Sequence, residues 1–170
     1  VFVAGNAFSR EHNTKFAVVR YGNVMGSRGS VIPFFHSLKD TGEIPITDTR
    51  MTRFMITLEQ GVELVWTAFE DAMGGEIYVK KIPSMNIVDL AKAVAPDAKH
   101  NIIGIRPGEK LHEQMIGTED SFHTFEYDGY YKILPSIYNC STESERINGG
   151  KKCPEGFSYA SDTNTEWMSV

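Results

Sequence analysis

The chain has 170 residues, and 17 lysines and arginines against 22 aspartates and glutamates give it a formal charge of −5. This acidic balance is not typical of a nucleic-acid-binding protein, and 41% hydrophobic with 23% charged residues indicates a globular chain rather than a disordered one. No apolar run reaches the roughly 18 residues of a membrane span, and no stretch resembles a signal peptide. Two cysteines are too few for a secreted fold held together by disulfides. We therefore expect a cytoplasmic α/β protein.

Both ends of the sequence resemble breaks within a longer chain. The first residues, VFV, include no initiator methionine, and the last residues, NTEWMSV, resemble the start of another element. We therefore expect a segment of a longer protein, in which residues 1–12 form the last turns of a helix.

Short apolar runs then alternate with helical periodicities. Lys15 to Tyr21 (KFAVVRY) has the β-branched and aromatic composition of a buried strand. A glycine-rich loop covers residues 22–30, and Ser30 can cap a helix that has Phe34, Phe35 and Leu38 on its apolar face.

A longer helix is predicted after Thr57, where Thr57 to Gln60 has the spacing of a capping box. Its expected buried stripe recurs at steps of three and four residues, and comprises Leu58, Val62, Val65 and Phe69. Later strands are predicted over residues 76–79, 101–105, 122–127 and 131–134, with a short helix over 87–94 and a polar loop over 139–156. The alternation of helices and strands favours a parallel α/β sheet, at least to residue 79.

The loop over residues 22–30 is the first candidate site. It leaves the end of a predicted parallel strand and enters a helix, a place where open α/β sheets bind ligands and where free N–H groups attract anions. Its glycines lack the G-x-G-x-x-G spacing, so an ordinary β–α connection is an equal alternative.

Arginines mark two further candidate sites. Arg106 and Glu109 flank a Pro-Gly turn, where a guanidinium suits phosphate and a carboxylate suits ribose hydroxyls, although a surface turn with an ion pair is the simpler alternative. Arg50 and Arg53 could likewise face phosphate or solvent. No metal site is expected, because His112-Glu113 lacks the second histidine of a zinc helix and Cys140 and Cys153 have no companion ligands. The chain also contains no Tyr-x-x-x-Lys pair.

Four long runs carry a resemblance to a known family: RYGNVMGSRGSVIPFF, IPITDTRMTRFMITLEQGVELV, GGEIYVKKIPSMNIVDLAKAVAP and IIGIRPGEKLHEQMI. They closely resemble the inverting UDP-N-acetylglucosamine 4,6-dehydratases of pseudaminic acid synthesis, which are extended short-chain dehydrogenase/reductases. The resemblance covers almost the whole chain, including FSYASDTNTEW near its end, but not the loop over 139–156.

This resemblance implies the C-terminal part of a Rossmann-type parallel sheet, interleaved with a small α/β domain that binds the UDP-sugar. In the family's lyase reaction a hydride passes from sugar C4 to NADP⁺, a proton leaves C5 and water is eliminated from C6. The hydride then returns at C6 as C5 inverts. The catalytic Tyr-x-x-x-Lys and the NADP glycine loop should lie upstream of Val1, so this segment alone is expected to be inactive. The expected partners are UDP-N-acetylglucosamine and, in the full-length protein, further copies of the chain.

Residue by residue, the resemblance implies the following site. Asn23, Ser30, Val31, Arg53, Arg106 and Glu109 would bind the substrate, with Asn23 and Arg53 at the diphosphate and Arg106 and Glu109 at phosphate and ribose. The backbone of Tyr21, Gly22 and Val24 would lie beside the nicotinamide of NADP. Residues 1–79 would hold the last Rossmann elements with an inserted substrate segment at about 22–56, and residues 80–170 would form the substrate domain.

Two alternatives stay open. One is another extended family member, such as a retaining dehydratase or a UDP-sugar C4 epimerase. The other is a non-catalytic UDP-sugar-binding or interaction module that starts near Val1.

Overall fold

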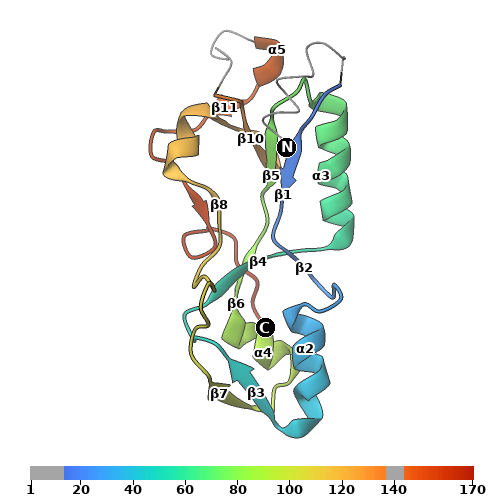
Figure 1. Cartoon of the computed structure of the whole chain (residues 1–170), viewed down its shortest axis with the longest axis vertical. Coiled ribbons are helices and arrows are strands. Elements are labelled where there is room, and N and C mark those ends of the chain that lie inside the picture. The colour runs from blue at the N-terminus through green and yellow to red at the C-terminus, as the bar shows by residue number, and fades with distance from the viewer. Residues whose placement is uncertain (1–13, 137–143) are drawn as a thin grey trace. The chain divides into compact units, whose positions relative to one another are not determined.

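The computed structural model describes residues 14–136 and 144–170 (Figure 1). Its contacts divide the chain into two compact units, each built from three separate stretches. The first unit comprises the described residues of Val1–Tyr21, Glu59–Lys81 and Met115–Ser158, and the second comprises Gly22–Leu58, Ile82–Gln114 and Tyr159–Val170. The stretch predicted as one substrate domain, residues 80–170, is therefore shared between the two units.

The first unit is built on a five-stranded sheet in the order β1-β5-β10-β9-β11. β1 runs parallel to β5, whereas β10, β9 and β11 join by antiparallel pairing. The strands are β1 (Val18–Arg20), β5 (Ile77–Lys80), β9 (Thr124–Glu126), β10 (Tyr130–Ile133) and β11 (Lys151–Lys152). The strand predictions for residues 15–21, 76–79, 122–127 and 131–134 are confirmed. Residues 115–158 group with β1 and β5 because β10 continues their sheet.

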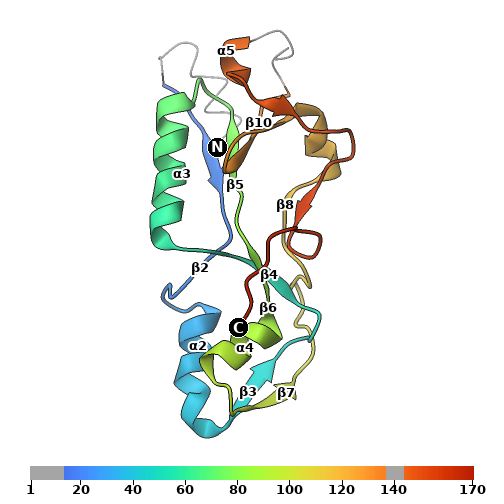
Figure 2. The same ribbon diagram turned by 180° about the vertical axis from the view of Figure 1, so that it is seen from behind.

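Helix α3 (Leu58–Asp71) lies alongside β1 and β5 (Figure 2). Leu64, Ala68 and Ala72 form its core with Tyr78, and Val19 packs against them. The predicted buried stripe is wrong, because Leu58, Val62, Val65 and Phe69 are 64%, 46%, 46% and 78% exposed. Two adjacent faces of this helix have the same apolar spacing, and the face with the smaller side chains is the one that approaches the sheet.

The second unit has two small sheets. β2 (Asn23–Val24) runs parallel to β4 (Thr52–Ile56), which pairs antiparallel with β6 (Ser84–Asn86). β3 (Glu43–Ile46) runs parallel to β7 (Lys99–Ile102), slightly before the strand predicted at 101–105.

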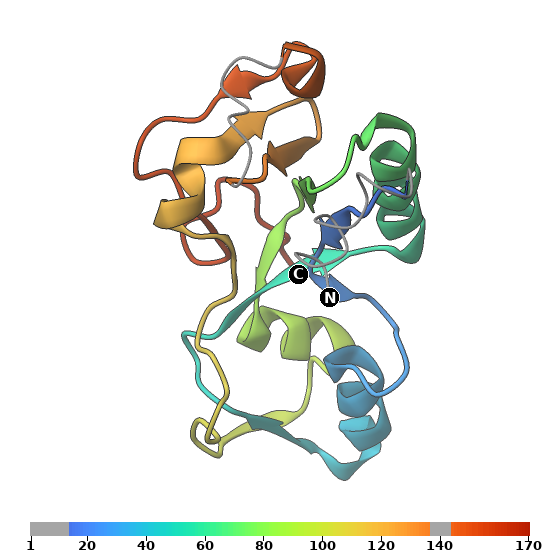
Figure 3. The ribbon, with the colours of Figure 1, turned by 45° about the horizontal axis from the view of Figure 1, so that its top comes forward.

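Two helices complete the core of this unit. α2 (Val31–Leu38) and α4 (Ile87–Val94) confirm the predicted helices, and they lie side by side with both contacting β3 (Figure 3). Phe35, Ile44, Ile46 and Leu90 are among the buried residues that they enclose. The second unit thus has its own hydrophobic core, against which its loops are fixed.

The chain returns to the second unit in its last stretch and makes polar contacts with β6 and the residues just before it. The Tyr159 hydroxyl donates to the Ile82 carbonyl oxygen and accepts from the Ile82 N–H, both at 2.9 Å. The Ser84 N–H donates to the Glu166 carbonyl oxygen at 2.9 Å. These contacts are long-range in sequence, and no local pattern predicts them.

The remaining elements are short: η1 (Lys39–Thr41), β8 (Gln114–Ile116), η2 (Thr118–His123), α5 (Ser144–Ile147) and β12 (Tyr159–Ala160). The described part of the predicted loop over 139–156 thus contains α5 and β11. The helix predicted over 1–12 and Cys140 lie outside the described residues. Among the described helices, none has the length and apolarity that crossing a membrane requires.

Candidate functional site

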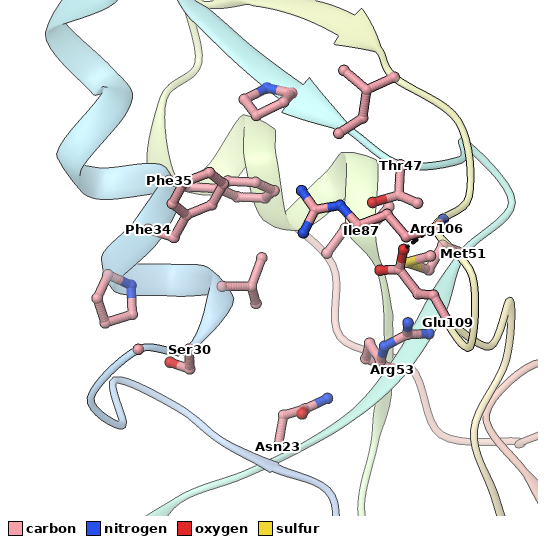
Figure 4. A pocket seen from close by; sticks show the side chains of 15 residues that line it. Asn23, Ser30, Phe34, Phe35, Thr47, Met51, Arg53, Ile87, Arg106 and Glu109 are labelled. Carbon is pink, nitrogen blue, oxygen red and sulfur yellow. Dashed lines mark hydrogen bonds between the residues drawn. The ribbon is translucent and has the colours of Figure 1, made fainter.

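A cavity of about 720 Å³ lies in the second unit, within the size range of small-molecule sites (Figure 4). The lining residues come from β2, the loop before α2 and the first turns of α2, β3, the segment between β3 and β4, β4, the start of α4 and the segment after β7. All six residues that the sequence assigned to the substrate are among its lining residues: Asn23, Ser30, Val31, Arg53, Arg106 and Glu109. The fold therefore brings together residues that lie up to 86 positions apart in the sequence.

The start of α2 forms one wall of this cavity. Ser30 occupies the N-cap position, and its carbonyl oxygen accepts from the Phe34 N–H at 3.2 Å. Its side chain makes no cap hydrogen bond, contrary to the prediction, and its buried hydroxyl has no hydrogen-bond partner in the part of the chain that the structure describes. A buried hydroxyl without a partner costs about 1–3 kcal/mol. A helix start and an unsatisfied hydroxyl are both suited to a ligand that carries anionic oxygens.

The turn at Arg106 to Glu109 forms the opposite wall. The Glu109 carboxylate accepts from the Arg106 backbone N–H at 3.2 Å, and the Glu109 N–H donates to the Arg106 carbonyl oxygen at 3.0 Å. Gly108 has a φ of 81°, which a side chain would strain. The Glu109 carboxylate thus binds the backbone of Arg106 and forms no ion pair with its guanidinium. The guanidinium of Arg106 instead extends toward the wall formed by α2 (Figure 4).

Arg53 enters the cavity from β4, but much of its guanidinium is engaged. Nη1 donates to the carbonyl oxygens of Thr52 and Leu111 at 2.7 and 3.1 Å, and Nη2 donates to that of Lys110 at 2.9 Å. Three of the five N–H groups of an arginine are thereby used, and Nε lies 3.9 Å from Oε1 of Glu113. Arg53 therefore both fixes residues 110–111 and carries positive charge into the cavity.

Arg50, the other arginine of this segment, is bound to a different partner. Its Nη2 lies 2.8 Å from Oδ2 of Asp48, and its side chain is 70% exposed. Side-chain and backbone hydrogen bonds from Arg50 lower the pKa of Asp48 to about 2. Of the two arginines that the sequence left open, only Arg53 lines the cavity.

The residues expected beside the nicotinamide do not line this cavity. Tyr21 follows β1 and is 43% exposed, whereas Val24 pairs with Ile56 across β2 and β4. A Cβ atom on Gly22 would lie 2.5 Å from the Cβ atom of Phe54, so β4 leaves no room for a side chain there. This close approach explains the glycine without reference to a cofactor.

Several lining residues were missed by the sequence reasoning: Phe34, Pro45, Thr47, Met51 and Ile103. Phe34 was assigned to the buried face of its helix, yet it is 44% exposed while its neighbour Phe35 is 2% exposed. Two adjacent phenylalanines cannot share one face of a helix, and that signal was present in the sequence. In the described residues, no group of three or more histidine, cysteine, aspartate or glutamate side chains could hold a metal.

The chain is similar to a known protein family and to several known proteins. A family model described as "Polysaccharide biosynthesis protein" matches residues 1–135. The inverting UDP-N-acetylglucosamine 4,6-dehydratase of Campylobacter jejuni is 54% identical over 99% of this chain and 53% of the relative. A UDP-glucose 4-epimerase of Rickettsia typhi is 46% identical over 82% of this chain and 42% of the relative.

Among solved structures, Pen from Bacillus thuringiensis matches with a TM-score of 0.83 and 31% identity, over 98% of this chain and 50% of that one. The chain therefore spans about half the length of the curated relatives it matches. The match to Pen confirms the predicted α/β fold class.

Proposed function

The chain belongs to the polysaccharide biosynthesis protein family, and on that premise we propose that it is the C-terminal, UDP-sugar-binding half of an inverting UDP-N-acetylglucosamine 4,6-dehydratase. One observation carries the proposal: the Arg106 guanidinium and the unsatisfied Ser30 hydroxyl line the same cavity at the start of a helix. The 54% identity to the Campylobacter enzyme supports the choice of reaction.

The charges of the cavity suit a nucleoside diphosphate. Arg53 and Arg106 contribute two guanidiniums against the single carboxylate of Glu109, and the first N–H groups of α2 have no partner within the helix. A diphosphate supplies the acceptor oxygens that these donors require. The partly exposed ring of Phe34 offers an apolar surface to the nucleoside.

A nicotinamide cofactor belongs to the proposed reaction, and we propose NADP. When bound, it supplies the transient hydride acceptor that the oxidation at sugar C4 requires. Tyr21 and Gly22 follow the carboxyl end of the parallel strand β1, which is the edge where open α/β sheets bind ligands, and Val24 lies two residues further on. In this proposal the backbone of these three residues contacts the cofactor, while the cavity of the second unit holds the UDP-sugar.

A C4 epimerase is the second candidate, because the Rickettsia relative carries that description. The full-length protein, incubated with UDP-N-acetylglucosamine and NADP⁺, distinguishes the two. A dehydratase yields a 4-keto product that has lost the C6 hydroxyl, and NMR of C5 separates inversion from retention. An epimerase yields a C4 epimer that keeps the C6 hydroxyl. If neither product forms and UDP does not bind, the proposed function is wrong.

A further inference from the structure

We infer that Glu113 is a positioning residue, which holds Asn23 and Arg53 in the orientation that receives the anionic part of the ligand. The inference rests on the proposed function. Oε1 of Glu113 accepts from Nδ2 of Asn23 at 3.2 Å and lies 3.9 Å from Nε of Arg53. Its other oxygen, Oε2, accepts from the Phe54 backbone N–H at 3.0 Å. Glu113 is not a lining residue of the cavity, so it acts through residues that are.

The chemistry of a carboxylate explains why this position suits glutamate. An ionised carboxylate only accepts hydrogen bonds, so the amide of Asn23 must present its NH₂ group to Glu113 and its carbonyl oxygen elsewhere. One N–H and the carbonyl oxygen of Asn23 then remain for a ligand. The same carboxylate balances the charge of Arg53, whose other engaged donors bind neutral carbonyl groups. A single side chain thus sets the orientation of two ligand-facing residues.

Glu113 is itself held by a buried polar network. Its N–H donates to the Ser161 hydroxyl at 2.9 Å, and its carbonyl oxygen accepts from the Ser161 N–H at 2.8 Å. The Ser161 hydroxyl also lies 2.7 Å from that of Thr52, which in turn lies 2.8 Å from Nδ1 of His112. Ser161 is fully buried and Thr52 is 4% exposed. Because β4 and the last stretch of the chain fix the backbone of Glu113, its carboxylate has a defined position.

A double-mutant cycle in the full-length protein tests this role, with UDP as the probe and calorimetry as the readout. In Glu113→Gln, the new NH₂ group must face either the Phe54 N–H or the Asn23 NH₂ group, and both are donors. We expect UDP affinity to fall by about fivefold in this variant, which is the size of effect that residues in direct contact commonly have on one another. In an Asn23→Ala background, Glu113→Gln should reduce UDP affinity by clearly less, because Glu113 then acts on the ligand through Arg53 alone. The matched control is Glu43→Gln, which alters an exposed glutamate of the same unit outside the cavity and should leave UDP affinity unchanged.

A second measurement leaves Glu113 intact, in case its substitution prevents folding. Asn23→Asp places a second carboxylate against Glu113, and two adjacent carboxylates raise the pKa of one of them despite the nearby Arg53. The ratio of UDP affinity between Asn23→Asp and the wild type should therefore rise as pH falls from 8 to 5. A ratio that stays constant with pH overturns the positioning role. So does an equal loss of UDP affinity on Glu113→Gln in the wild-type and Asn23→Ala backgrounds. Either result, with a wild type that binds UDP, leaves the proposed function intact. Failure of the wild type to bind UDP overturns the proposed function, and this inference with it.

Discussion

Removal of the Arg106 side chain should weaken UDP binding without destabilising the protein. The turn around Arg106 is closed by its backbone N–H and carbonyl groups, which a substitution to alanine retains. The guanidinium makes no ion pair or hydrogen bond to the described residues, so the free energy of unfolding should change by less than about 0.5 kcal/mol. A hydrogen bond to a charged group contributes about 1.5–3 kcal/mol, and 1.4 kcal/mol corresponds to tenfold in affinity. Arg106→Ala should therefore reduce UDP affinity about tenfold or more.

Calorimetric titration of the full-length protein with UDP and with uridine measures this effect. Uridine lacks the phosphates, so its weaker affinity should be the same in Arg106→Ala and the wild type. Arg106→Lys should fall between the two, because lysine keeps the charge but loses the planar fork of donors. The matched control is Arg50→Ala, since Arg50 is bound to Asp48 and lies outside the cavity. Unchanged UDP affinity in a folded Arg106→Ala protein would refute the reasoning and make Arg106 a turn residue only.

Three further predictions follow from other contacts. Glu109→Ala should weaken UDP binding less than Arg106→Ala does, because water can replace a carboxylate at neutral ribose hydroxyls; a larger loss would contradict this role. The 170-residue chain should self-associate through the exposed face of α3, and light scattering should show that Phe69→Lys reduces this association. Ala68→Lys, at a site that is 5% exposed, should instead unfold the chain. A monomeric wild-type chain would contradict the prediction. Burial raises the pKa of Asp71, but hydrogen bonds from Lys132 and Tyr78 outweigh this effect and lower the pKa overall. Asp71 therefore stabilises the fold above its unfolded pKa, and this stabilisation is lost as pH falls through its folded pKa. Asp71→Asn leaves the buried Lys132 unpaired and should cost roughly 3 kcal/mol at pH 7 in urea unfolding, with a smaller difference at pH 3; an equal difference at both pH values would count against the ion pair.

The sequence was informative where short-range chemistry decides the structure. The strand at Val18–Arg20 and the helices at Val31–Leu38 and Ile87–Val94 follow from composition, periodicity and caps, and the structure has all three. The six residues that the family resemblance assigned to the substrate line one cavity. Their assignment came from the long motifs, because the residues alone left Arg106 and Glu109 open between a ligand site and a surface turn.

Other features depend on contacts that no local pattern encodes. The apolar spacing of α3 fits two faces, and only the sheet decides that Leu64 and Ala68 are buried while Phe69 is exposed. Glu113 was considered only as part of an incomplete zinc motif, since its partners Asn23 and Ser161 lie 90 and 48 residues away. The division of residues 80–170 between the units likewise follows from strand pairing, because β10 joins β5.

The alternation of the chain between its two units has a consequence for biosynthesis. The second unit is assembled from residues 22–58, 82–114 and 159–170, and Ser161 joins Thr52 across 109 positions. During translation, Asn23 and Arg53 leave the ribosome well before Glu113, and Glu113 precedes the serine that holds it. Contacts so distant in sequence form late, after the loops between them have closed. The lining residues of the cavity have all emerged once Glu109 has, but the serine that holds Glu113 follows much later. Asn23 and Arg53 should therefore reach their final orientation only after the segment from Tyr159 onward has emerged.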